Sequence, residues 1–194
     1  MKELYEVLYK YTDYGDMDKG RCPAYRILSN YINWIEGPIC DLGCGRGNLV
    51  KIFRDLNCVI DGYDYIKSSD YVIEKDITKP INLKKYKTAI CIDVFEHMFD
   101  DGVNGVIDNL KQTERQVLTV HIGKSEDWVK GVDLHINIKP FPVWDWIFKE
   151  NFNIYKMYNI TDHQRIYLTE NKNLSKEKSR IPKDWTEDDK RRKV

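Results

Sequence analysis

A glycine-rich turn near residue 43 is the feature that most constrains the fold of this chain. Residues 39–50 read ICDLGCGRGNLV: an apolar run that ends at Asp41, three glycines at alternate positions, and a helix start near Asn48. Glycine has no Cβ, so this backbone can turn tightly and approach a ligand closely. The helix that follows begins with unpaired N–H groups. The pattern predicts a binding loop at the carboxyl edge of a strand, where open α/β sheets hold their ligands.

The glycine spacing differs from that of the two common phosphate-binding loops. A dinucleotide-binding loop reads Gly-x-Gly-x-x-Gly, and here Asn48 stands where its last glycine belongs. The Gly-Lys-Ser/Thr of a P-loop is also missing from the segment. Asp41 would repel a pyrophosphate at short range and suits a cationic ligand group instead. The remaining alternative is a tight strand-to-helix turn in some other α/β protein.

The loop resembles motif I of the class I S-adenosylmethionine-dependent methyltransferases, in which an acidic residue precedes Gly-x-Gly-x-Gly. The wording Asp-Leu-Gly-Cys-Gly is among the more specific short motifs of that family. The resemblance covers residues 39–170 and implies an α/β, Rossmann-like fold. That fold has seven mostly parallel strands, a terminal antiparallel hairpin, and helices on both faces. The implied cofactor is S-adenosyl-L-methionine, with S-adenosyl-L-homocysteine as product.

The resemblance also implies which residues bind the cofactor. Asp64 ends the second predicted strand, and its two carboxylate oxygens could accept hydrogen bonds from the ribose hydroxyls. Asp61 is the rival acid, but it falls inside that strand. Asp76 resembles the acid that meets the adenine amino group, with the Ile77 N–H donating to the ring. The full implied set is Asp41, Gly43, Cys44, Gly45, Asp64, Tyr65, Asp76, Ile77, Asp93, Val94 and Arg21.

Residues 88–98, TAICIDVFEHM, are the second informative stretch. Their nearly continuous apolar run predicts a central strand buried on both faces and ending at Asp93. The segment Asp-Val-Phe-Glu-His-Met, residues 93–98, resembles the fourth motif of small-molecule methyltransferases of the ubiquinone-biosynthesis type. One difference is Thr88, at the start of the stretch, where that pattern has Asp. The resemblance places Asp93 near the methionine end of the cofactor. It leaves Glu96 and His97 to cap and orient the next turn, with direct catalysis by His97 as the alternative.

Two histidines are the candidate catalytic residues. Methyl transfer from a sulfonium is an in-line displacement, and a base can take a proton from the acceptor. A neutral imidazole suits this task near pH 7. His121 ends the fifth predicted strand, and His135 lies in the long connection 122–140. The alternative for His135 is a structural role, and Trp128 and Trp144 would either wall an acceptor pocket or belong to the core.

The first 37 residues predict a helical lid or cap on the core. A first helix would carry Leu4, Val7, Leu8 and Tyr11 on its inner face. A second helix, opened by Pro23, would carry Tyr25, Leu28, Ile32 and Ile35. Residues 12–21 between them predict an ordinary connection or a flexible lid, with Lys19 or Arg21 reaching the cofactor carboxylate.

The rest of the chain predicts a single domain that ends at residue 170. Further strands are expected at 58–64, 71–77 and 116–121, with a closing hairpin at 153–158 and 164–169. Helices are expected at 48–56, 103–110 and 141–152. The segment 66–70 is too short for the full helix that the family usually has between its second and third strands.

Composition narrows the class of protein. A chain of 194 residues with 42% hydrophobic residues can bury a core, and equal counts of 31 basic and 31 acidic residues point to no polyanionic partner. The five cysteines form no zinc or redox pair, which predicts a reduced, cytoplasmic protein without a metal. No apolar run reaches the length of a membrane span, and the start is not a signal peptide.

Residues 171–194 differ in kind, with nine Lys or Arg against five Asp or Glu. A charged tail of this composition is predicted to be solvated or loosely docked, although a basic tail can also contact nucleic acid.

The first functional hypothesis is methyl transfer to a small metabolite or sugar hydroxyl. The alternative is the same fold as a nucleic-acid-binding or regulatory module, or as a nucleic-acid methyltransferase. Residues 93–96 lack the Pro-Pro of nucleic-acid amino methyltransferases, which disfavours that last activity.

Overall fold

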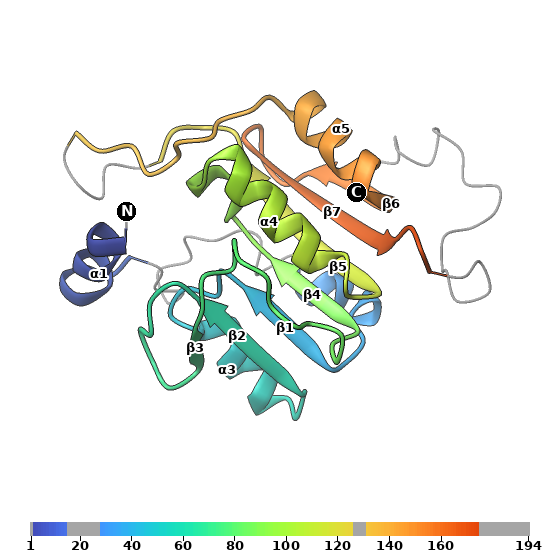
Figure 1. The fold of residues 1–194 in the computed structure, drawn as a ribbon, viewed down its shortest axis with the longest axis horizontal. Coiled ribbons are helices and arrows are strands. Elements are labelled where there is room, and N and C mark those ends of the chain that lie inside the picture. Colours follow the sequence, from blue (N-terminus) through green and yellow to red (C-terminus); the bar gives the residue numbers. More distant parts are fainter. Residues whose placement is uncertain (1, 15–27, 126–130, 175–194) are drawn as a thin grey trace.

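The fold is a single sheet of seven strands with helices packed on both of its faces (Figure 1). It is seen in a computed structural model that describes residues 2–14, 28–125 and 131–174. The strands are β1 Ile39–Leu42, β2 Ile60–Asp64, β3 Val72–Glu74, β4 Thr88–Cys91, β5 Arg115–His121, β6 Phe152–Asn159 and β7 Gln164–Asn171. The helices are α1 Lys2–Tyr11, α3 Asn48–Asp55, α4 Asp100–Leu110 and α5 Phe141–Asn151, with the 3-10 turns η2 Ser29–Trp34 and η3 Phe95–His97.

The strand order is β3-β2-β1-β4-β5-β7-β6. Strands β1 to β5 pair in parallel, whereas β7 runs antiparallel to both β5 and β6. The order reverses between β1 and β4, and the crevice at such a point is where open α/β sheets bind ligands. The predicted parallel sheet with a terminal antiparallel hairpin is confirmed.

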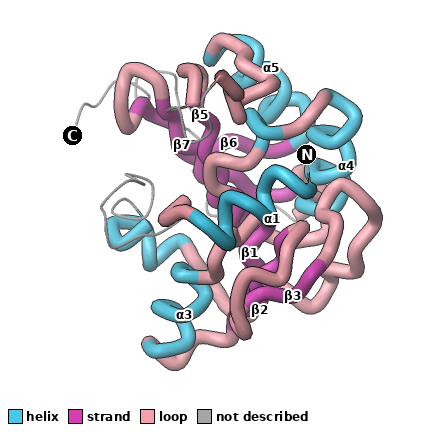
Figure 2. The backbone as a smooth tube through the Cα atoms, turned by 90° about the vertical axis from the view of Figure 1, so that its left-hand side faces the viewer, coloured by secondary structure: helices cyan, strands magenta, loops and turns pink. Residues whose placement is uncertain are grey.

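The two faces of the sheet are covered by different helices (Figure 2). Helix α3 packs Leu49, Val50 and Phe53 onto one face, together with Leu28 and Trp34. Helices α4 and α5 cover the other face with Val103, Val106, Ile107, Leu110, Trp144 and Phe148. Every residue of β1 and β4 is therefore buried, which explains why the sequence of these strands is nearly continuous in apolar residues. Helices on both faces are confirmed.

Helix α1 differs from its predicted packing. Leu8 is buried as expected, but Val7 and Tyr11 are 50% and 70% exposed. The reason is that α1 does not lie on an apolar sheet face. Its Tyr5 and Tyr9 side chains instead face the loops at the carboxyl edge, as the contacts below show. The second predicted helix is only partly correct in its inner face. Leu28, which precedes η2, is buried, but Ile32 within η2 is exposed.

The third strand is shorter than the predicted 71–77, because β3 spans only Val72–Glu74 and pairs with β2 alone. The segment before it, 66–70, contains no helix, as expected. Among the described residues, no helix is long and apolar enough to cross a membrane.

Candidate cofactor and acceptor site

The glycine loop joins the end of β1 to the start of α3. Gly43, Gly45 and Gly47 have φ angles of +76°, +58° and +75°, which lie in the left-handed region that favours glycine. A Cβ on Gly43 would come within 2.4 Å of Cγ2 of Val94, the residue after Asp93. The loop therefore packs directly against the turn that follows β4, and the two predicted motifs meet at one place.

Asp64 ties the end of β2 to this loop. Its Oδ2 accepts a hydrogen bond of 2.9 Å from the Gly45 N–H, and its Oδ1 lies 3.3 Å from the N–H of Ile66. Burial raises the pKa of Asp64 to about 6, and the backbone N–H groups that it accepts from offset part of this rise. The carboxylate is thus placed beside the glycine loop, where the resemblance expects the ribose. Tyr65, the next residue, is 43% exposed.

Asp41 is buried within β1, and its Oδ2 makes no hydrogen bond within the described part of the chain. Burial, and then the negative charge of Asp64, raise the pKa of Asp41 to about 8. A buried acid of this kind ionises more readily when a cation approaches. Its environment therefore suits the cationic ligand group expected from the sequence.

Asp93 is held by two strands that sequence reasoning did not connect with it. Its φ of +51° is unusual for a residue other than glycine. The Thr119 hydroxyl donates to Oδ1 at 2.6 Å, and the Gln164 amide donates to Oδ1 and Oδ2 at 2.7 and 2.6 Å. Thr119 lies in β5 and Gln164 begins β7, so only the pairing of those strands brings both to Asp93. No local sequence signal marks either residue.

Asp76 and Ile77 follow β3. Oδ1 of Asp76 accepts hydrogen bonds from the Thr78 N–H at 3.0 Å and from the Thr78 hydroxyl at 2.6 Å. The Ile77 carbonyl accepts from the Asn109 amide at 2.9 Å, and the Ile77 side chain is buried. These bonds anchor the turn to α4. The adenine contacts expected of both residues stay a prediction.

Helix α1 contacts the glycine loop through Arg46. This guanidinium donates to the backbone carbonyls of Tyr9, Thr12 and Tyr14 at 2.8 to 2.9 Å, and so caps the end of the helix. A Cβ on Gly45 would lie 3.4 Å from the Tyr9 hydroxyl. The first helix therefore lies against the predicted cofactor loop, as a cap would.

The structure places one of the two candidate acceptor-pocket tryptophans in the core. Trp144 is fully buried and packs on Phe95 and Phe148, so it belongs to the core and does not wall an acceptor pocket. Arg21, Lys19 and Trp128 lie outside the described residues.

All four histidines of the chain lie near one another. The His135 ring centroid is 4.8 Å from that of His97 and 5.0 Å from that of His121. His121 in turn lies 6.2 Å from the ring of the exposed His163. His121 ends β5 at the carboxyl edge, and both it and His135 are half-buried. The two proposed bases are thus brought together beside the turn that follows β4.

Glu96 does not cap the turn, and that expectation is wrong. It is fully buried, and neither of its carboxylate oxygens makes a hydrogen bond of good geometry. Burial raises its pKa well above the ordinary value and the charge of Asp93 adds to this, although the backbone amides of Glu96 and His121 lower it in part. The burial comes from long-range packing, because the N–H of Asn137 bonds to the Glu96 carbonyl at 3.0 Å and brings the 131–140 segment over η3.

His97 is held in the neutral form. Burial, and then the nearby His135, lower its pKa to about 4. Its Nδ1 lies 3.0 Å from the Leu134 carbonyl and 2.9 Å from the Tyr5 hydroxyl of α1. His97 therefore joins the first helix, the turn after β4 and the long connection at one point.

Comparison with known proteins gives matches in structure alone. No family profile matches the sequence, and no curated protein is similar to it. The PH0226 protein from Pyrococcus horikoshii OT3 is 16% identical, with 88% of this chain and 99% of that chain covered and a TM-score of 0.68. The glycopeptide N-methyltransferase MtfA with S-adenosyl-L-homocysteine is 12% identical, with coverage of 76% and 88% and a TM-score of 0.58.

A third match is the magnesium protoporphyrin IX methyltransferase from Synechocystis PCC 6803 with bound S-adenosyl-L-homocysteine. It is 17% identical, with coverage of 76% of this chain and 78% of that chain and a TM-score of 0.55. At such identities the matches concern the fold, and fold alone does not assign a substrate. They agree with the sheet architecture described above. The chain therefore has the Rossmann-like fold of the class I S-adenosylmethionine-dependent methyltransferases.

Proposed function

We propose that this protein transfers a methyl group from S-adenosyl-L-methionine to a hydroxyl of a small metabolite or sugar, and releases S-adenosyl-L-homocysteine. The observation that carries the proposal is the contact of Asp64 with the glycine loop, which follows β1 at the point where the strand order reverses. Two of the structural matches are methyltransferases with S-adenosyl-L-homocysteine bound, which supports the same cofactor here.

The cofactor would lie along the carboxyl edge from β3 to β4. Asp64 would accept hydrogen bonds from the ribose, and Asp76 with Ile77 would meet the adenine. The methionine end would lie near the buried Asp41, whose environment suits an ammonium group. The other residues proposed to contact the cofactor are Gly43, Cys44, Gly45, Tyr65, Asp93, Val94 and Arg21.

The acceptor would bind beside the histidines. Removing the proton of a hydroxyl during attack makes its oxygen a better nucleophile, and a neutral imidazole can accept that proton. His121 and His135 lie at the same edge as Asp93, which supports their role in activating the acceptor. The acceptors named for the matched proteins, a glycopeptide and a magnesium porphyrin, differ widely although the proteins share a fold. Acceptor specificity of this chain would therefore depend on the residues of its own loops.

We also propose that the protein works in a reducing compartment such as the cytoplasm. Cys40, Cys44, Cys58 and Cys91 are free thiols in the part of the chain that the structure describes, which is usual for proteins of such compartments.

Two measurements test the proposal. Calorimetry with S-adenosyl-L-homocysteine should show binding to the wild-type protein and weaker binding to Asp64→Asn. A methyl-transfer screen with labelled donor should then compare sugars, small acids, nucleotides and nucleic acid. Absence of cofactor binding by the folded protein would exclude the proposal. Labelling of nucleic acid alone would favour the alternative function, which is based on the composition of residues 171–194.

A further inference from the structure

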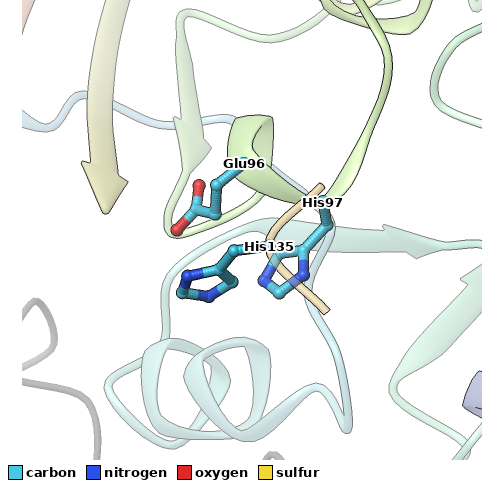
Figure 3. Close-up of side chains that lie close together, drawn as sticks. All are labelled: Glu96, His97 and His135. Atoms are coloured by element: carbon cyan, nitrogen blue, oxygen red, sulfur yellow. The ribbon is translucent and has the colours of Figure 1, made fainter. Parts of the chain in front are cut away.

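Glu96, His97 and His135 form a cluster that the proposed cofactor site does not use. Each residue offers one potential metal-ligand atom, and these three atoms lie within 4.8 Å of one another. Glu96 and His97 come from η3, and His135 comes from the connection between β5 and α5, so their side chains converge from two segments (Figure 3). Ligands of one Zn²⁺ ion, bound at about 2.0–2.2 Å, lie at most about 4.4 Å apart. Small side-chain rotations would therefore bring all three atoms to one ion.

Glu96 is the second observation that points to a cation. It is fully buried, and neither carboxylate oxygen makes a hydrogen bond of good geometry or an ion pair with any described residue. An ionised carboxylate that is buried without a cationic partner is strongly unfavourable, and binding a cation is one of the ways in which proteins compensate for it. Its carboxylate lies beside the His135 and His97 rings, so a cation placed among the three would contact it directly.

The hydrogen bond of His135 leaves its Nε2 available. Nδ1 of His135 lies 2.6 Å from the Gly123 carbonyl. A carbonyl only accepts, so this Nδ1 carries the hydrogen and Nε2 keeps its lone pair. Nδ1 of His97 lies 3.0 Å from the Leu134 carbonyl and 2.9 Å from the Tyr5 hydroxyl, and donation from Nδ1 to the carbonyl would leave Nε2 of His97 free in the same way. Histidines that bind metals commonly donate their other ring N–H to a backbone carbonyl in this way.

His121 differs from His135. Its Nδ1 lies 3.1 Å from the Gly123 N–H and 3.3 Å from the Gly123 carbonyl, so these two contacts are compatible with either tautomer. His121 also lies outside the cluster of Glu96, His97 and His135.

We propose that Glu96, His97 and His135 bind one divalent transition-metal ion of the Zn²⁺, Co²⁺ and Mn²⁺ class, and that its open coordination positions take the oxygen of the methyl acceptor. Two histidines and one carboxylate leave positions open for substrate, as in catalytic metal sites. The proposal that the cluster binds a metal ion is independent of the proposed methyl transfer. The proposal that this ion binds the acceptor oxygen rests on it. The prediction of no metal was based on cysteine spacing, and it therefore does not apply to a site made of one carboxylate and two imidazoles.

With the ion bound, His135 would be a metal ligand in place of the base proposed above, and it would activate the acceptor through the ion. A hydroxyl bound to a divalent ion loses its proton more readily, and that proton would pass to solvent. The oxygen lone pair would form the new O–C bond to the donor methyl group. The C–S bond would break with its electron pair left on sulfur, and the metal would keep its oxidation state throughout.

Titration of the metal-free protein with Co²⁺ tests the site without any need for activity. We expect one equivalent to bind with a visible spectrum of nitrogen and oxygen ligation and without a sulfur-to-cobalt charge-transfer band. Glu96→Gln and His135→Ala should each weaken Co²⁺ binding by more than about tenfold. His163→Ala is the matched control and should bind like the wild type, because His163 lies at the same edge but outside the cluster.

Melting temperatures and cofactor binding complete the test. Glutamine matches Glu96 in size and is uncharged, so Glu96→Gln should melt in metal-free buffer no lower than the wild type while losing Co²⁺. If wild type fails to bind Co²⁺, or if both variants bind as tightly as it does, the site is excluded. Calorimetry with S-adenosyl-L-homocysteine separates the two proposals: cofactor binding without Co²⁺ binding refutes the metal site alone, and the reverse refutes the proposed methyl transfer alone.

Discussion

The carboxylate of Asp64 accepts a 2.9 Å hydrogen bond from the Gly45 N–H, and so joins the end of β2 to the glycine loop. Asp61, the rival acid in the same strand, is turned to other partners. It accepts hydrogen bonds from the Tyr86 hydroxyl at 2.5 Å and from Lys85 at 3.0 Å. Only Asp64 is therefore placed for a ligand that approaches the glycine loop.

Replacing Asp64 by alanine should weaken S-adenosyl-L-homocysteine binding by about 1.5–3 kcal/mol, the contribution of a hydrogen bond to a charged group. The ribose hydroxyls need the ionised acceptor, and the pKa of Asp64 is about 6. Wild-type affinity should therefore fall as pH is lowered through 6, whereas Asp64→Asn should lose this dependence. Calorimetry at several pH values measures both. Asp61→Asn is the control, and a larger effect there than at Asp64 would show that the wrong acid was chosen.

The buried Asp41 should make stability depend on pH. Its pKa is about 8 in the folded protein and about 4 when unfolded, so between these values the folded state binds more protons. The free energy of unfolding should fall as pH rises through this window, by about 1.4 kcal/mol per pH unit for one proton. Asp41→Asn should remove that part of the slope, as measured by denaturant unfolding without ligand. The exposed Asp101→Asn is the control, and equal slopes in wild type and Asp41→Asn would contradict the assignment.

Gly43→Ala should destabilise the fold as well as the cofactor site. The space beside Gly43 is filled by Val94, so an added Cβ would clash with Val94 at 2.4 Å. The left-handed φ adds about 1–2 kcal/mol. Gly131 has a similar φ of +80° with no heavy atom within 4 Å of the added Cβ, so Gly131→Ala should show the backbone cost alone. Thermal melts of the two variants compare these terms, and Val94→Ala should partly rescue Gly43→Ala. Equal losses at Gly43 and Gly131 would show that the contact with Val94 is unimportant.

The position of a C-terminal truncation should decide its effect. Strand β7 runs to Asn171, and the buried Glu170 lies 3.6 Å from Nε of Arg115. Truncation after Thr169 would remove this carboxylate and the end of the strand, and should lower the melting temperature clearly. Truncation after Leu174 should leave the melting temperature and cofactor affinity nearly unchanged, as expected for a solvated tail. A large loss on truncation after Leu174 would mean that residues 175–194 dock on the domain.

The histidine variants should separate turnover from cofactor binding. His135→Ala should lower turnover far more than affinity for S-adenosyl-L-homocysteine, and His121→Ala should lower turnover less. The wild-type rate should rise with pH as a histidine loses its proton. Burial, and then the nearby His135, lower the pKa of His121, so its titration should appear below the ordinary value of about 6.5. A pH profile that is unchanged in both variants would exclude both histidines as the base.

Local sequence was sufficient to predict the glycine loop and most strands. Gly43, Gly45 and Gly47 all adopt left-handed φ angles, a requirement that only glycine meets without cost. The apolar run of β4 was predictable because burial on both faces removes any alternation with polar residues. Asp64 was predictable because it is the last residue of its strand, and the end of a strand can be read from the chain itself.

The environment of the site was decided by tertiary structure. Gln164 reaches Asp93 because β7 pairs antiparallel with β5, and the register of that pairing depends on packing between segments far apart in the chain. Glu96 is a local turn residue in sequence, but the segment that bonds to its backbone buries it beside His97 and His135. The sequence by itself thus determined the glycine loop and the strands around it. Only the tertiary structure decided which distant side chains meet there, because burial and hydrogen-bond partners arise from contacts that no local pattern encodes.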